Sequence, residues 1–242
     1  MIIEHPTMAD IPTLRRLWKA AFSDTDAFLD LFFSLAFSPE RALIVREGGE
    51  ARAMLYFLDC ADFSYVYAVA TEEKCRGKGY CRALMEKLHQ ERKRTVLVPV
   101  NENLRAFYER FGYRSFGGIT ESMCSADDTY VKAEELTIES YMQKRKALLP
   151  KGGLRQEGDF VPLLKQMLSF YGGDGWLMAL AEEDGKYIAL EFLGDKSVLP
   201  GILHTLQLES ACVRCPGNAP FAMCRSEDGD DFLPTYFAFA LD

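Results

Sequence analysis

The segment from Val69 to Leu88, VATEEKCRGKGYCRALMEKL, places a charged loop between an apolar strand and an amphipathic helix. The loop and the first turn of the helix carry four basic side chains and two glycines: Lys74, Arg76, Gly77, Lys78, Gly79 and Arg82. Glycines let a backbone approach a ligand closely, and the first N–H groups of a helix attract anions. The segment therefore predicts a strand-to-helix crossover that binds an anion.

Apolar periodicity on both sides of this loop predicts alternating strands and helices. Helices are expected at residues 7–22, 23–37, 79–92 and 101–111, with Thr7 and then Ser23 or Asp24 as caps. Strands are expected at residues 2–4, in a hairpin at 41–59 that turns at 47–50, and at 64–71, 95–100, 113–118 and 119–125. The segment TVLVPV is apolar throughout, as a central strand would be. This order predicts an α/β fold, of the α+β kind, with a mixed sheet.

The same order of elements partly repeats after the polar segment at residues 125–130. Helices are expected at 137–148, 160–170 and 197–208, a hairpin at 175–195, and strands at 209–215 and 233–242. A repeated order of elements indicates an internal duplication. We therefore expect two domains, 1–125 and 126–242.

Composition and charge exclude several classes of function. The chain has 242 residues, of which 48% are hydrophobic and 26% charged, and no apolar run approaches the length of a membrane span. The first 125 residues carry 17 basic and 17 acidic side chains, so the net charge of -8 belongs to the remainder. A nucleic-acid partner does not suit such a chain, and neither does a membrane.

The seven cysteines are scattered, odd in number, and not preceded by a secretory signal, which predicts reduced thiols in the cytoplasm. Cys212 and Cys215 form a CxxC, but they lie in an expected strand, and no second ligand pair completes a zinc site. We expect packing thiols and no metal.

Three chemistries of glycine loops compete for the crossover. A nucleotide P-loop requires GxxxxGK[ST], which the chain lacks. A dinucleotide fingerprint would place its third glycine at Arg82, whose side chain obstructs helix packing. The remaining pattern, Arg76-Gly-Lys-Gly-Tyr-Cys81, resembles the [QR]xxGx[GA] signature of the GNAT N-acetyltransferase superfamily, with Cys81 where Gly or Ala is usual. Asn101 and Tyr108 also match the recurrent NxxxxxxY segment of that family, and the likeness in element order covers residues 1–120.

The resemblance implies that the anion is the pyrophosphate of acetyl-CoA. The implied cofactor-binding residues of the loop are Arg76, Gly77, Lys78, Gly79, Tyr80 and Cys81. Main-chain groups of Val69 and Thr71 would pair with the pantetheine arm, between two parallel strands that splay apart. The alternative for these two residues is an ordinary core strand. Asn101 would contact the pantetheine, or it would only cap a helix.

The resemblance also implies that Tyr108 is the general acid that protonates the leaving thiolate. The alternative is that Tyr108 packs among neighbouring aromatic rings. A base must accept the proton of the incoming amine, and several carboxylates are candidates that no pattern separates. They are Asp59, Asp62, Glu72 and the terminal carboxylate of Asp242.

In the second half, Asp195 and Pro200 replace the basic glycine loop, so we expect one coenzyme site per chain. The resemblance implies an N-acetyltransferase that acts on a primary amine of a small molecule or peptide. A CoA-binding sensor or scaffold without turnover is the alternative. The apolar run Phe28–Phe37 could cover a sheet or a second copy of the chain, so a homodimer stays open.

Overall fold

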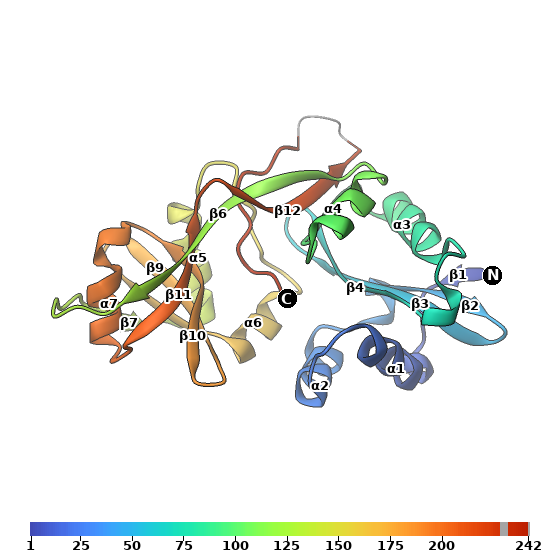
Figure 1. The fold of residues 1–242 in the computed structure, drawn as a ribbon, viewed down its shortest axis with the longest axis horizontal. Coiled ribbons are helices and arrows are strands. Elements are labelled where there is room, and N and C mark those ends of the chain that lie inside the picture. Colours follow the sequence, from blue (N-terminus) through green and yellow to red (C-terminus); the bar gives the residue numbers. More distant parts are fainter. Residues whose placement is uncertain (228–231, 242) are drawn as a thin grey trace. The chain divides into compact units, whose positions relative to one another are not determined.

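The structure is a computed structural model that describes residues 1–227 and 232–241. The chain divides into two units by its internal contacts. The first unit holds Met1–Arg114, Gly158–Leu163 and Cys224–Phe232, and the second holds Ser115–Glu157, Leu164–Met223 and Leu233–Asp242. Figure 1 labels most of the elements of both units.

The first unit is a strand layer with helices on both faces (Figure 1). Its elements are β1 (Ile2–Glu4), α1 (Ile11–Ala21), α2 (Asp26–Leu35), β2 (Ala42–Glu47), β3 (Glu50–Asp59), β4 (Ser64–Thr71), α3 (Tyr80–Glu91), β5 (Arg94–Leu97) and α4 (Glu102–Glu109). The strands follow the order β1-β2-β3-β4-β5. Neighbours are antiparallel except for β4 and β5, which run parallel on either side of the α3 crossover.

An aromatic cluster fastens α1 and α2 to one face of the sheet. Trp18 of α1 is fully buried, and its ring centroid lies 4.8 Å from Phe32, 5.3 Å from Tyr56 and 5.5 Å from Tyr67. On the other face, the buried Leu84, Met85 and Leu88 lie on α3, as its amphipathic pattern predicts. The crossover helix is therefore held against the sheet, and its N-terminus lies at the end of β4.

Local signals fix most boundaries of the first unit, with two corrections. Thr25, rather than Ser23 or Asp24, caps α2, because its hydroxyl accepts a hydrogen bond from the Phe28 N–H at 3.2 Å. The expected strand at 95–100 ends at Leu97. Pro99 follows two residues later and has no N–H to donate to a strand ladder.

The second unit has a similar order of elements. The strands and helices of this part of the sequence are β6 (Arg114–Ser125), β7 (Glu134–Glu135), α5 (Ile138–Leu148), α6 (Val161–Met167), β8 (Ser169–Gly173), β9 (Trp176–Glu183), β10 (Lys186–Leu193), α7 (Leu199–Thr205), β11 (Ser210–Pro216) and β12 (Ala219–Ser226). Of these, β6, α6 and β12 each include residues of the first unit. The strand order is β12-β6-β11-β10-β9-β8-β7, and β10 and β11 are parallel. The second expected hairpin is therefore present as β9 and β10.

Three expectations for strands and helices after α4 were wrong. Residues 113–118 and 119–125 form one strand, β6, and the helix expected at 160–170 is α6 followed by β8. Residues 233–241 form no strand within the part that the structure describes. Their backbone groups bond elsewhere: Gln156 Nε2 donates to the Phe239 carbonyl at 2.6 Å, and Gln156 Oε1 accepts from Ala238 N at 3.2 Å.

The expected division at residue 125 differs from the contact units. Strand β6 follows α4 in the sequence, but it pairs antiparallel with β11 from Ile119↔Pro216 to Ser125↔Ser210. Cys224–Phe232, in contrast, belongs to the first unit. Each unit therefore contains a strand segment from the other half of the sequence, which a single cut in the sequence cannot describe.

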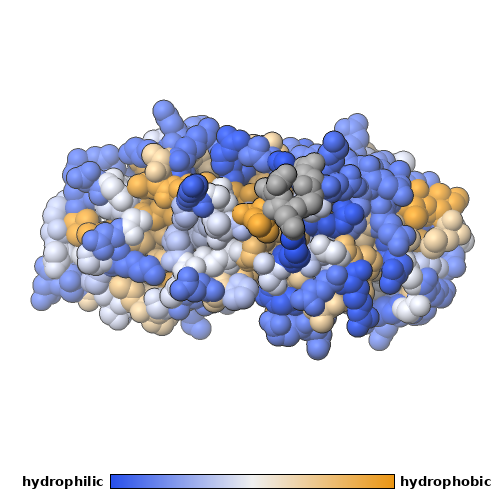
Figure 2. Space-filling model, turned by 90° about the horizontal axis from the view of Figure 1, so that it is seen from above, coloured by the Kyte–Doolittle hydropathy of each residue, from blue (hydrophilic) through white to orange (hydrophobic). Residues whose placement is uncertain are grey.

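Polar side chains cover most of the face drawn in Figure 2, with scattered hydrophobic patches between them. Of the helices that the structure describes, none is both long and apolar enough to cross a membrane. All seven cysteines are free thiols. Among residues 1–227 and 232–241, no cluster of His, Cys, Asp or Glu could hold a metal ion.

Candidate functional site

The site begins where β4 separates from β5. The two strands pair only at Ser64↔Thr95 and Tyr65↔Val96 within the described residues. Further along, β4 gains an extra residue relative to β3, and Ala68 adopts the left-handed region with φ 49°. Such a bulge bends a strand and redirects its backbone. The end of β4 thus keeps a backbone edge that β5 does not pair with.

Hydrogen-bond alternation shows which residues use this open edge. The Glu72 N–H donates to the Arg52 carbonyl at 2.8 Å, so residue 72 points toward β3. Because successive residues of a strand direct their N–H and C=O groups to opposite sides, Thr71 points to the open side. By the same alternation Val69, two residues before Thr71 in β4, also points to the open side.

The glycine loop reaches α3 through two left-handed residues. Gly77 has φ 79° and Gly79, the N-cap of α3, has φ 83°. No atom lies within 4 Å of where a Cβ would stand at either position, so the space beside them is open. The hydrogen bonds of α3 begin at Ala83, whose N–H donates to Gly79 O at 3.0 Å. The N–H groups before it are those that a helix leaves to a ligand or solvent.

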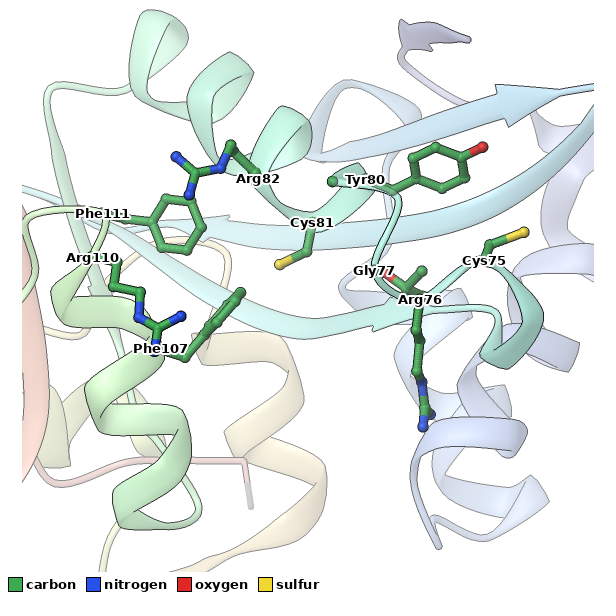
Figure 3. Close-up of a pocket in the computed structure, with 11 residues that line it drawn as sticks. Cys75, Arg76, Gly77, Tyr80, Cys81, Arg82, Phe107, Arg110 and Phe111 are labelled. Carbon is green, nitrogen blue, oxygen red and sulfur yellow. The ribbon is translucent and has the colours of Figure 1, made fainter.

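A cavity of about 290 Å³ opens beside this loop. Its lining comes from the loop, α3 and α4: Thr71, Cys75, Arg76, Gly77, Gly79, Tyr80, Cys81, Arg82, Phe107, Arg110 and Phe111. Figure 3 shows the Arg82 side chain over the ring of Phe111, and the guanidinium carbon lies 5.4 Å from the ring centroid. The cavity is therefore bounded by backbone N–H groups, cationic side chains and aromatic rings.

The two cations predicted in the loop differ: Arg76 lines the cavity and Lys78 does not. Lys78 does not line the cavity; its Nζ lies 3.3 Å from Oε2 of Glu47, at the end of β2. The side chain of Arg76 extends away from Arg82 and Phe111 in Figure 3. Arg82, one of the four basic side chains that the sequence places around the loop, lies beside Phe111, and Arg110, which the sequence analysis did not name, lies beside Phe107 (Figure 3).

Cys81, the departure from the family motif, lines the cavity and is partly buried. Burial raises the pKa of its thiol to about 11. The thiol is therefore neutral near pH 7 and adds no negative charge to a site that is suited to an anion.

Tyr108 lies on α4, next to this cavity but not among the residues that line it. Its side chain is 8% exposed, and its ring packs edge-on against Phe107 at 5.3 Å and Tyr113 at 5.9 Å. Burial raises its pKa, and the neighbouring Cys81 and Tyr113 raise it further. The phenol therefore stays protonated at neutral pH.

Asn101 caps α4 in the structure. Its Oδ1 accepts a hydrogen bond from the Leu104 N–H at 3.0 Å, and its side chain is exposed. The helix-cap alternative for Asn101 is therefore present, while a contact with a cofactor stays a prediction.

Two of the carboxylates that were candidate bases are committed to ion pairs. Burial alone would raise the pKa of Asp59, but hydrogen bonds from Arg92 and Ser64 hold it below its ordinary value. Burial would likewise raise the pKa of Glu72, but hydrogen bonds from cationic neighbours, the strongest from Arg52, lower it. Both are weak bases at neutral pH. Asp62 lies on the exposed turn after β3, and Asp242 lies outside the described residues.

Sequence reasoning missed the α4 side of the cavity. Phe107 and Phe111 stand four residues apart, a spacing that places side chains on one helix face, and both line the cavity with Arg110. Their spacing was the available signal. Nothing in the sequence indicated which face of the helix would meet α3.

Fold and site together define an α/β protein in which a bulged, opened strand leads through a glycine loop into a helix. Residues 38–115 match the family model described as "Acetyltransferase (GNAT) domain". The first unit of the chain therefore contains a segment that matches a GNAT acetyltransferase domain. No curated protein sequence matches the chain.

Solved structures share the fold over most of the chain. A GCN5-related N-acetyltransferase from Kribbella flavida superposes with a TM-score of 0.69 at 13% identity, covering 93% of this chain and 71% of the other. One from Anabaena variabilis gives 0.69 at 13%, with 93% and 72% covered. Eis1 from Mycobacterium abscessus gives 0.63 at 9%, with 93% and 74% covered. At such identities the likeness establishes the fold alone.

Proposed function

We propose that the protein is an N-acetyltransferase that moves an acetyl group from acetyl-CoA to a primary amine of a small molecule or peptide. One observation carries the proposal. The glycine loop and the bare start of α3 open into a cavity directly beside the unpaired edge of β4. That arrangement offers N–H donors to a diphosphate and a strand edge to an amide-containing arm.

The residues present fit the phosphate end of coenzyme A. Gly77 and Gly79 provide conformations that other residues adopt only with strain, and the space beside them is open. Arg82 and Arg110 bring positive charge to the cavity, and the neutral thiol of Cys81 brings none of the opposite sign. The coenzyme would supply the activated acetyl thioester.

The strand edge of β4 would bind the pantetheine arm, and Tyr108 and water would transfer the protons. Main-chain groups of Thr71 and Val69 are proposed to pair with the pantetheine amides on the open side of β4. Tyr108 is proposed to give its proton to the departing sulfur, because its raised pKa keeps the proton available. Since Asp59 and Glu72 are held by arginines, water is proposed to take the proton of the attacking amine.

One observation favours the second candidate, a CoA-binding sensor or scaffold. Tyr108 is almost fully buried and does not line the cavity, so its phenol would have to gain access to the reacting sulfur when the ligand binds. If it does not, the chain would bind CoA without turnover.

Release of free thiol from acetyl-CoA, measured with a panel of small-molecule and peptide amines, distinguishes the two candidates. We expect amine-dependent release from the intact protein. CoA at about 100 times its Kd should also stabilise the fold by about 2.7 kcal/mol, which a thermal shift detects. Stabilisation without amine-dependent release would favour the sensor, and the absence of both would overturn both candidates.

We also propose that the second unit is a GNAT-like domain without coenzyme, and that the protein works in the cytoplasm, in keeping with its free thiols. A homodimer stays a proposal for the half-exposed aromatic side of α2, which includes Phe28 and Phe33. The molecular mass in solution, measured by light scattering, tests it.

A further inference from the structure

Glu72 stands at a place where a negative charge should be unfavourable. It directly follows Thr71, which lines the cavity, and it begins the turn that leads into the glycine loop. An anion bound there would be repelled by a nearby carboxylate. The side chain is nevertheless only 15% exposed, and its carboxylate contacts cationic side chains of the protein.

Three cations from three elements meet this carboxylate. Arg52 of β3 lies 2.9 Å from Oε2, and Arg16 of α1 lies 3.3 Å from Oε1. Lys74, in the turn Glu73–Cys75 that begins the loop, lies 3.3 Å from Oε1. Glu72 therefore joins the sheet, the α1 face and the glycine loop at one point.

The backbone of Glu72 carries the same connection. Its N–H donates to Arg52 O at 2.8 Å, and its carbonyl accepts from the Cys75 N–H at 2.8 Å. Residue 72 thus ends the pairing of β4 with β3 and starts the tight turn. Its backbone therefore marks where the loop leaves the sheet, at the same residue whose carboxylate binds the three cations.

We propose that Glu72 is a positioning residue of the coenzyme site: it holds the turn Glu73–Cys75, so that the following residues Gly77–Gly79 keep the conformation that presents their N–H groups to the diphosphate. The inference rests on the proposed function. It assigns no contact between Glu72 and the ligand. The carboxylate acts through Arg52, Arg16 and Lys74, which it fixes against the loop.

The proposal predicts an effect opposite in sign to simple electrostatics. If only charge mattered, Glu72→Gln would remove a repulsive group and strengthen binding of an anionic ligand. If positioning matters, the same change releases three cations and loosens the loop, and binding weakens. Glu73→Gln is the matched control. It removes the same charge one residue away, from an exposed side chain that no ion pair joins within the described residues.

Two measurements on the full-length protein test this, both without activity. Trypsin can cut after Lys74, Arg76 and Lys78, so cleavage without ligand reports how well the loop is held. We expect Glu72→Gln to be cut about tenfold faster than wild type, and its Kd for CoA to rise about tenfold, as the loss of charge-assisted hydrogen bonds implies. Glu73→Gln should stay within about twofold of wild type in cleavage, with equal or tighter CoA binding.

A steady-state readout separates positioning from a general loss of structure. We expect the KM for acetyl-CoA to rise in Glu72→Gln while kcat stays near the wild-type value. Arg16→Gln is a second variant for the case that Glu72→Gln does not fold, since its side chain is 51% exposed. It should speed loop cleavage about threefold, because one of the three ties is lost.

The proposal would be overturned if Glu72→Gln equalled Glu73→Gln in the rate of loop cleavage and in CoA affinity. Tighter CoA binding by Glu72→Gln would overturn it as well. Unchanged cleavage in Arg16→Gln would count against it in the same way. If wild-type protein binds no CoA, the proposed function fails, whereas the cleavage comparison still decides whether Glu72 holds the loop.

Discussion

Both units contain a crossover in which a strand leads through a loop into a helix and back to a parallel strand. In the first unit a cavity lies beside the loop of this crossover. In the first unit β4 leads through Glu72–Gly79 into α3 and back to β5; in the second, β10 leads through Gly194–Val198 into α7 and back to β11. Strands β4 and β10 each contain a bulge. The parallel pairs β4–β5 and β10–β11 are each in register at two positions. The shared framework shows that the backbone of the crossover does not by itself make a site.

The difference lies in what fills the end of the strand. In the second unit, a Cβ on Gly194 would stand 2.7 Å from Trp176 Cβ, whereas the space beside Gly77 and Gly79 is open. The Ser197 N–H, which could otherwise face a ligand, donates to Asp195 Oδ1 at 2.9 Å. The second unit passes from its turn at Lys196–Val198 directly into α7, whereas the first unit has Gly77–Gly79 between its turn at Glu73–Cys75 and α3.

A buried ion pair occupies the second unit beyond its bulge. Glu191 is fully buried, and its carboxylate accepts from Arg145 Nε at 2.7 Å and from the Tyr141 hydroxyl at 2.7 Å. In the first unit the corresponding end of β4 has Thr71 at the cavity. This part of the second unit is therefore a packed interior that contains an ion pair.

The largest expected effect tests that packed interior. Glu191→Gln leaves the Arg145 cation buried without its counter-ion, and we expect the free energy of unfolding to fall by about 3 kcal/mol. Chemical denaturation measures it. Glu121→Gln, which removes a half-exposed partner of Arg214 at 2.7 Å, should cost less than about 1 kcal/mol. Equal effects would show that the ion pair does not stabilise the second unit.

The next prediction tests the open loop of the first unit. Gly79→Ala puts a side chain on a residue with φ 83° at the start of α3 and should weaken CoA binding about 30-fold, because the donors shift when the strain relaxes. Calorimetry with CoA measures it. Gly185→Ala in the turn between β9 and β10 has a similar φ of 74° and is the matched control. A loss of affinity in both variants would contradict a specific role for the loop.

Turnover gives a smaller expected effect. Tyr108→Phe should lower kcat about tenfold, since general acid catalysis contributes at least that much, while the KM for acetyl-CoA stays unchanged. The phenol of Tyr130, 72% exposed in the second unit, provides the control variant Tyr130→Phe. Unaltered turnover in Tyr108→Phe would remove the assignment of the acid and favour the sensor.

The smallest effect concerns pH and the first unit alone. Burial and the Arg225 cation lower the pKa of His89 to about 4, and its Nε2 lies 3.3 Å from the Tyr113 hydroxyl. The unfolded chain therefore binds one more proton between pH 6.5 and pH 4, so stability falls as the pH falls through that window. We expect a loss of about 1 kcal/mol from pH 6.5 to 5.5.

Denaturation at the two pH values measures this loss. His89→Gln should remove most of the slope. His204→Gln, at an exposed histidine of the second unit, should leave it in place. A slope that survives in His89→Gln would assign the pH dependence to other groups.

Local patterns predicted most elements but not their long-range pairing. The hairpin of β2 and β3, the strand β4 and the amphipathic α3 follow from turns and apolar spacing, which act over a few residues. The pairing of β6 with β11 joins residues about 90 positions apart in the sequence, as Arg214↔Glu121 shows. No local pattern contains that choice, and the expected domain division at residue 125 therefore differs from the contact units.

The site divides in the same way. The glycine loop is a local feature, because Gly77 and Gly79, which adopt positive φ, directly precede the start of α3 in the sequence. The places of Lys78 and Arg110 depend on tertiary contacts: Lys78 pairs with Glu47 on another strand, and Arg110 reaches the cavity because α4 lies beside α3. The sequence motif includes Lys78, which was therefore predicted to bind the coenzyme, and it does not include Arg110.

The stoichiometry of CoA binding tests the contrast between the units most directly. Titration calorimetry of the full-length protein should give one CoA per chain, with binding reduced about 30-fold by Gly79→Ala and unchanged by Asp195→Ala in the second unit. Two equivalents of CoA per chain, or affinity that depends on Asp195 and not on Gly79, would contradict the account.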